Sequence, residues 1–150
     1  MSTGDLPERM YRNNRPADPN FDGAEQLYRR CRQEDVENGH LSRSAVGFPD
    51  WSVNRAKYSE PGDALLPRWP DWGVASFAVA DVPSSLVSEG GTVIEFRIEH
   101  VPEEENYAHS EVRAYKNGRH DRKLDVPKTV KARFRQILSE RTHIAIEPRV

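Results

Sequence analysis

The chain of 150 residues has one cysteine, Cys31, and lacks both a long apolar run and a glycine-rich phosphate loop. A single thiol cannot close an internal disulfide, and this scarcity of cysteine is typical of a reducing compartment. No segment approaches the roughly 18 apolar residues of a membrane span, and the first residues lack the apolar centre of a secretory signal. The few glycines form neither GxxxxGK[ST] nor GxGxxG, which excludes a P-loop nucleotide hydrolase. We therefore expect a cytoplasmic protein without a membrane partner.

Metal ligands at a recognisable spacing are also absent. The histidines form no pair at i, i+4 and have no cysteine partner, so neither HExxH nor a zinc-finger pattern is present. We expect no metal site and no bound cofactor. Cys31 lies among arginines that could lower its thiol pKa, although a small buried structural residue is the commoner case. The histidines are His40, His100, His109, His120 and His143.

Net charge is small, because 22 basic and 24 acidic residues leave a formal charge of −2. The two signs are nevertheless segregated along the chain. Residues 89–111 hold seven glutamates and one arginine, whereas residues 112–150 hold eleven basic and four acidic residues. Either the basic third binds phosphates, or the two blocks lie close together in the fold and neutralise each other, which is the commoner arrangement.

The first 24 residues have the composition of an arm. Prolines and the pair Asn13-Asn14 disfavour regular structure, yet large apolar groups are present. Arginines and aromatic residues in such a segment suit docking on a neighbour. We expect residues 1–24 to form a flexible or partner-docking arm and residues 25–150 to form a single globular domain. The side chains expected to bind a partner are Met10, Tyr11, Arg12, Arg15 and Phe21.

The globular part has the patterns of a sheet with few helices. Residues 73–81 are apolar on both faces, as in a covered strand, and residues 92–99 alternate between apolar and charged. Residues 126–141 have a helical apolar stripe with a proline in the first turn, and residues 143–147 form a last strand. Gln26–Cys31 is a strand or a helical turn. We predict an α+β fold with a mixed, mostly antiparallel sheet, a C-terminal hairpin, one C-terminal helix and a final strand.

Residues 33–72 are rich in glycine and proline, which predicts loops with short elements between them. Forty structureless residues would be unusual inside a compact domain. We expect Trp51, Trp69 and Trp72 to insert into the core and hold this segment down, because an indole buries a large area.

The pair Asn117-Gly118 predicts a type I′ hairpin turn between strands 110–116 and 119–124. Alternation then places six polar side chains on one face of the hairpin. Such a set suits metal-independent RNA cleavage, with a general base, a general acid and cations on the phosphate. The alternative is an exposed sheet face whose polar groups only contact water. The six are His109, Glu111, Arg113, Tyr115, His120 and Arg122.

A second set of residues resembles the arginine, Ser-x-Ser, Glu-x-Glu order of ADP-ribosyltransferases. Arg29 comes first, Ser42-Arg43-Ser44 follows, and Glu103-Glu104-Glu105 comes last. The resemblance implies that Arg29 binds the phosphates of NAD, Ser42 supports the nicotinamide ribose, and Glu105 activates the acceptor or orients the ribose. Residues 51–55 are another candidate for the serine strand.

Three functional hypotheses therefore stay open. The first is a non-catalytic accessory subunit of a cytosolic assembly, which binds a protein partner through the arm and the charged faces. The second is a small toxin-like enzyme, either an ADP-ribosyltransferase that uses NAD or the ribonuclease described above. The third is a nucleic-acid-binding protein that uses one side of the C-terminal helix, formed by Lys128, Lys131 and Arg135.

Overall fold

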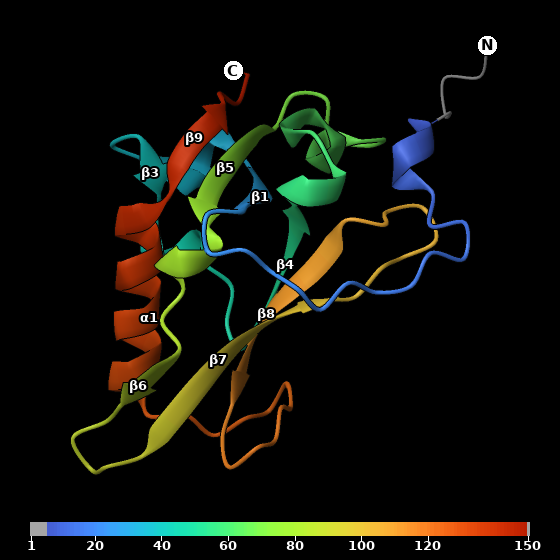
Figure 1. Ribbon diagram of the computed structural model, residues 1–150. Helices are drawn as coiled ribbons and strands as arrows, with labels where there is room; N and C mark the ends of the chain where they lie inside the picture. The colour runs from blue at the N-terminus through green and yellow to red at the C-terminus, as the bar shows by residue number, and fades with distance from the viewer. Residues whose placement is uncertain (1–5, 150) are drawn as a thin grey trace.

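A computed structural model describes residues 6–149 and contains a curled seven-stranded sheet (Figure 1). The strand order is β6-β7-β8-β4-β1-β5-β9, and every pairing is antiparallel. The α+β class is thus confirmed, with a sheet that is antiparallel throughout rather than mixed. The strands are β1 (Gln26–Cys31), β4 (Asp50–Arg55), β5 (Gly73–Ala78), β6 (Ser85–Val87), β7 (Val93–His100), β8 (His109–Tyr115) and β9 (His143–Ile146).

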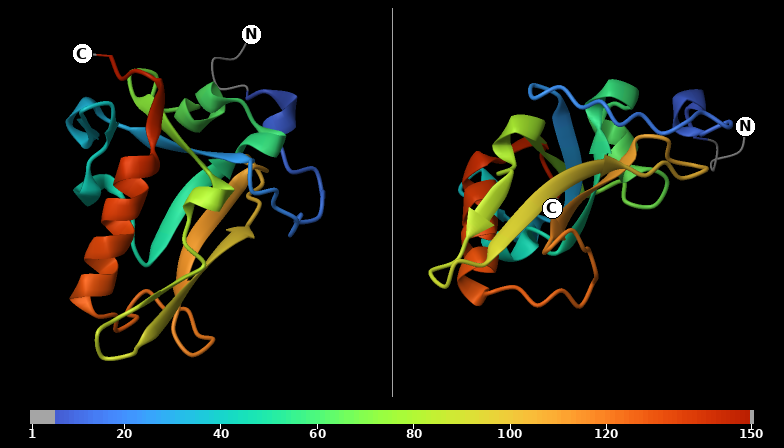
Figure 2. Two further views of the ribbon diagram at one scale, coloured as in Figure 1. Left: turned by 60° about the vertical axis from the view of Figure 1, so that its left-hand side comes forward. Right: turned by 60° about the horizontal axis from the view of Figure 1, so that its bottom comes forward.

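Helix α1 (Lys128–Arg141) packs beside the curled sheet and closes the core (Figure 2). Its buried residues are Val130, Phe134 and Leu138, at the spacing of one helical face. The Phe134 ring stacks on Phe96 of β7, with centroids 4.4 Å apart. The predicted helix and final strand are confirmed, and the helix starts directly after Pro127. No helix within residues 6–149 is long and apolar enough to cross a membrane.

The segment 33–72 contains short elements, as predicted, but only one of its tryptophans enters the core. Trp51 is buried and stacks on Phe77, with ring centroids 5.1 Å apart. Trp69 and Trp72 lie in the turns before β5 and stay half-buried, which corrects the expectation for these two indoles. The short elements are η2 (Gln33–Asp35), β2 (Val36–Glu37), β3 (His40–Leu41), η3 (Arg43–Ala45), η4 (Ala56–Tyr58) and η5 (Pro61–Leu65).

The C-terminal hairpin is shorter than predicted. Asn117 and Gly118 have φ values of 52° and 75°, as a type I′ turn requires. Beyond a single bridge between Lys116 and Arg119, however, residues 119–124 form no strand. The reason lies in the neighbours of β8, which pairs with β7 on one edge and with β4 on the other. Both edges are occupied, so no position is left for another strand.

Residues 6–24 pack along the globular part of the same chain. After η1 (Glu8–Met10) they follow the loop 101–108, on the opposite side of the molecule from α1 (Figure 2). The Tyr107 amide donates to the Met10 carbonyl at 2.8 Å, and the Tyr107 hydroxyl donates to the Pro16 carbonyl at 2.6 Å. The predicted arm therefore docks on its own domain, and residues 1–5 lie outside the described residues.

Candidate functional site

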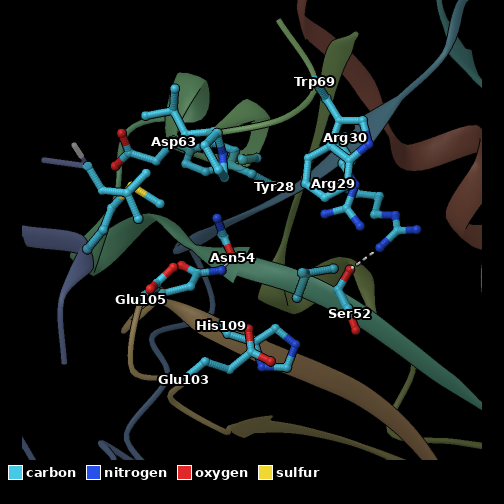
Figure 3. A pocket seen from close by; sticks show the side chains of 17 residues that line it. Tyr28, Arg29, Arg30, Ser52, Asn54, Asp63, Trp69, Glu103, Glu105 and His109 are labelled. Carbon is cyan, nitrogen blue, oxygen red and sulfur yellow. Dashed lines mark hydrogen bonds between the residues drawn. The ribbon is translucent and has the colours of Figure 1, made fainter. Parts of the chain in front are cut away.

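A cavity of about 310 Å³ lies between η5, the loop 101–108 and the arm, with β1, β4 and the start of β8 as its floor (Figure 3). Its apolar wall includes Met10, Val53, Leu66 and Trp69. Two arginines lie on one side, and two glutamates and a histidine lie on the other (Figure 3). The polar side chains that line the cavity are Tyr28, Arg29, Arg30, Ser52, Asn54, Asp63, Glu103, Glu105, Asn106 and His109.

The positive side of the cavity is built where two strands separate. β1 and β4 pair only near Leu27 and Tyr28, and the Arg29 Nη1 atom then donates to the Ser52 carbonyl at 3.0 Å. The Arg30 guanidinium lies 3.8 Å from the centroid of the Trp69 indole. Burial lowers the pKa of both arginines, and no carboxylate within residues 6–149 forms a salt bridge with either of them. Glu103 acts on the charge of Arg30 across the cavity, but neither arginine is held in a salt bridge, so both guanidiniums keep N–H donors for an anionic ligand.

The negative side comes from the loop before β8. Glu103 and Asn106 close a tight turn, in which each backbone amide donates to the other residue's carbonyl at 3.1 Å. Glu103 and Glu105 line the cavity, whereas Glu104 does not and instead accepts the Arg12 amide at its carbonyl. The turn thus directs alternate glutamates of the Glu-x-Glu segment to one site.

His109 is the first residue of β8 and lies beside this loop. Its Nδ1 atom is 2.8 Å from the Val101 carbonyl oxygen, which can only accept, so Nδ1 carries the proton. The Nε2 atom of the neutral ring is then an acceptor, and His109 can take a proton from a bound ligand.

The residues identified by resemblance to ADP-ribosyltransferases are only partly brought together. Arg29 and Glu105 line the same cavity, but Ser42 lies at the start of η3, where its hydroxyl is 3.2 Å from that of Ser44. Ser42 lines a separate hollow with residues of α1, so its predicted place beside Arg29 is wrong. Ser52, in the alternative segment 51–55, lies in the cavity and holds Arg29 through its carbonyl.

The polar face of the hairpin is a closed network of charges. Arg113 bonds Glu111 and Glu99, and Glu99 also accepts the Tyr115 hydroxyl at 2.7 Å. His120 Nδ1 is 2.9 Å from the Ala114 carbonyl. His109, Glu111, Arg113 and Tyr115 are half-buried on the expected face, yet only His109 lines the cavity.

This network brings the acidic block of residues 89–111 into contact with the basic block of residues 112–150. Glu99 belongs to the acidic block and Arg113 to the basic block, and the two lie on paired strands. At this contact the blocks neutralise each other. Arg122, the last residue of the predicted polar face, is exposed and lines a separate hollow with Glu111.

The residues expected to bind a protein partner contact the chain itself. Met10 is buried, and the Arg15 guanidinium lies 3.8 Å from the centroid of the Tyr107 ring. Arg12 Nε donates to the Arg15 carbonyl, and Phe21 lies under the guanidinium of Arg55 at 3.9 Å. Tyr11 is half-buried. These contacts hold the arm in place, and binding of a partner stays a prediction.

The three cationic residues of α1 that were expected to bind nucleic acid have unequal surroundings. Lys128 is exposed, whereas Lys131 is half-buried with its ammonium 6.0 Å from the centroid of the Phe48 ring. Arg135 Nε donates to the Val46 carbonyl at 2.9 Å. One of the three thus helps to fix η3 on the helix, and their binding of nucleic acid stays a prediction.

Cys31 is a buried structural residue. Burial raises the pKa of its thiol to about 11, so the arginines nearby do not make it a thiolate at neutral pH. Within residues 6–149, no group of three or more His, Cys, Asp or Glu side chains could hold a metal ion.

Several residues of the cavity were missed by sequence reasoning. Arg30 adjoins the predicted Arg29, and Glu103 is two residues before the predicted Glu105. Which residue of such a segment lines the cavity depends on the strand or turn in which it lies, and the sequence does not show this. Trp69 was assigned to the core, and Asn54 was only part of a candidate serine strand. The tandem Arg29-Arg30 inside a strand gave no signal of a shared site, since alternation predicts opposite faces for adjacent side chains, and the structure instead brings both to the cavity.

Comparison of the chain with protein-family models, with curated proteins and with solved structures finds no match, so the geometry of the cavity is the basis for assigning a function.

Proposed function

We propose that the chain is an enzyme that binds a nucleotide in this cavity, with the phosphate on Arg29 and Arg30. The observation that carries the proposal is the pair of partly buried guanidiniums that lack a carboxylate partner within the described residues. A phosphate dianion would supply the missing charge and accept several N–H donors at once. The cavity volume of about 310 Å³ suits a small ligand.

The flat side chains in the cavity support a ligand that carries a ring. The Trp69 indole and the Tyr28 phenol both line the cavity, and Arg30 lies over the indole. Aromatic and guanidinium planes stack favourably on a heterocycle. The two arginines would bind the phosphate of a nucleotide, and the neighbouring aromatic side chains would stack on its base.

ADP-ribosyl transfer from NAD is the reaction that the acidic side favours. Glu103 and Glu105 lie opposite Arg29, so the first and last members of the resemblance share one cavity. In that reaction the bond between ribose C1′ and nicotinamide breaks, and nicotinamide leaves with the bonding electrons. An acceptor gives its proton to the carboxylate and bonds to C1′. We assign the proton-accepting role to Glu105.

The test compares Glu105→Gln with Glu104→Gln. Both substitutions remove one charge from the same exposed turn, but only Glu105 lines the cavity. With NAD as substrate, we expect Glu105→Gln to lower the rate of nicotinamide release about 100-fold or more, and Glu104→Gln to leave it unchanged. Release is measured by chromatography. Equal rates in the two variants, or no release by the wild-type chain, would reject this reaction.

RNA cleavage is the second candidate, and the free Nε2 of His109 is the observation in its favour. His109 would accept the 2′-hydroxyl proton while Arg29 and Arg30 hold the phosphate. The 2′ oxygen would bond to phosphorus, and the 5′ oxygen would leave with the bonding electrons and take the proton back from the His109 imidazolium. This candidate predicts that the wild-type chain cleaves a single-stranded RNA and that His109→Ala abolishes cleavage. His120→Ala, outside the cavity, is the matched control and should cleave normally.

A further inference from the structure

One buried amide, that of Asn54, points its NH₂ end into the cavity. Asn54 of β4 is 5% exposed, and its Oδ1 atom accepts a hydrogen bond from Asn106 Nδ2 at 2.8 Å. The Nδ2 atom of Asn54 makes no hydrogen bond within residues 6–149. Figure 3 shows that the side chain points into the cavity. The Nδ2 atom is not fully enclosed, so it faces the open space of the cavity, where an acceptor on a ligand can meet it.

Asn106 determines which end of the Asn54 amide faces the ligand. Because Asn106 donates its NH₂ group to Asn54 Oδ1, the carbonyl end of Asn54 is occupied and the NH₂ end is presented. The backbone of Asn106 is held by the turn that it closes with Glu103, whereas its own Oδ1 atom is enclosed and has no hydrogen-bond partner within residues 6–149. The cavity therefore offers a fixed hydrogen-bond donor at a buried position, which recognises an acceptor and rejects a second donor.

We propose that Asn54 determines the specificity of the site by donating to a carbonyl oxygen on the ring of the nucleotide, and that Asn106 is its positioning residue. This inference rests on the nucleotide-binding function proposed above. The carbonyl can belong to a keto base, such as hypoxanthine, or to the carboxamide of nicotinamide. Both offer the same acceptor, a carbonyl oxygen. Adenine has an amino group at the 6-position and no carbonyl oxygen.

The experiment measures dissociation constants by calorimetry for three mononucleotides. IMP and AMP differ at the 6-position of the purine, where one has a keto oxygen and the other an amino group. Nicotinamide mononucleotide supplies the carboxamide. We expect the wild-type chain to bind IMP or nicotinamide mononucleotide about tenfold more tightly than AMP, as one hydrogen bond allows. Which of the two is preferred identifies the source of the carbonyl.

Asn54→Asp tests the residue directly, because it keeps the shape and replaces the donor by an acceptor. The carboxylate would repel a carbonyl and accept the 6-amino group, so the preference over AMP should disappear or reverse. Asn38→Asp, the same change in an exposed turn, should leave the ratio of affinities unchanged. Asn106→Ser is a second variant for the case in which Asn54→Asp does not fold, and it should reduce the ratio toward one.

The outcomes separate the two proposals. Equal affinities of the wild-type chain for all three nucleotides, or an unchanged ratio in Asn54→Asp, would overturn the role of Asn54 while nucleotide binding stands. No binding of any of the three by the wild-type chain would overturn nucleotide binding itself, and the role of Asn54 with it.

Discussion

At the scale of single residues, substitution of Arg30 is the most direct test of the proposed phosphate site. The Arg30 guanidinium lies over Trp69 and, among the described residues, forms no salt bridge, so its removal breaks no close ion pair of the fold. We expect Arg30→Ala to weaken nucleotide binding about 10- to 100-fold, the usual range for charge-assisted hydrogen bonds. Calorimetry checks this value. Arg133→Ala, an exposed arginine on α1, is the control, and an equal loss in both variants would contradict the assignment.

His100 predicts how stability depends on pH. Its Nδ1 atom accepts the Asp18 amide at 2.8 Å and its Nε2 atom lies 2.6 Å from the Tyr107 carbonyl, so the folded chain requires the neutral ring. Burial lowers the pKa of His100 below its ordinary value of 6.5. The unfolded chain then binds the proton first, and the free energy of unfolding should decrease as the pH falls below about 6.5.

Urea unfolding at pH 7.5 and pH 5.5 measures this dependence, above the range in which most carboxylates titrate. His100→Gln should be less stable at pH 7.5 but should lose less stability on acidification than the wild-type chain. His143→Gln, at an exposed position, should keep the wild-type dependence. If His100→Gln loses as much stability as the wild-type chain, His100 is not the group that titrates.

At the scale of elements, the arm is part of the cavity wall. Met10 lines the cavity, and the arm holds the loop 101–108 through Tyr107 and Glu104. We expect deletion of residues 1–17 to increase hydrogen exchange in this loop and to weaken nucleotide binding at least tenfold, while β5 and β9 stay protected. An unchanged affinity after the deletion would mean that the arm has a separate role, as the accessory-subunit hypothesis requires.

The elements also show what sequence patterns could and could not predict. Alternation and the helical stripe identified β7 and α1, because each has its own apolar face to bury. The strand predicted over residues 119–124 did not form, because β4 and β7 already pair with both edges of β8. The residues of that segment do not reveal this. Pairing over long sequence distances decided that case.

The same limit applied to the candidate site. Arg29 and Glu105 were selected by resemblance to the motif order of ADP-ribosyltransferases and His109 from the polar face of the hairpin, and the fold brings all three to one cavity. Ser42 was placed there by its order in the chain alone, but the β2–β3 hairpin carries it to another hollow. Asn54 was missed because one amide among the polar residues of β4 gives no signal until the fold brings Asn106 beside it.

At the scale of the whole molecule, a ligand that binds only the folded chain stabilises all of it. A nucleotide at about 100 times its dissociation constant contributes about 2.7 kcal/mol to the free energy of unfolding. For a chain of 150 residues we expect the melting temperature to rise by roughly 5–10 °C. Calorimetric scans with and without nucleotide check this, and a shift that persists in a variant lacking both Arg29 and Arg30 would place the ligand elsewhere.

The docking of the arm has a consequence for the order of assembly during synthesis. Pro16 leaves the ribosome early, but the Tyr107 hydroxyl that binds its carbonyl lies 91 residues later. At roughly 5–20 residues per second, the arm waits on the order of 5–20 s for its docking surface. Throughout that interval the nascent chain has no complete cavity, so a ligand can bind there only after the residues up to His109 have left the ribosome.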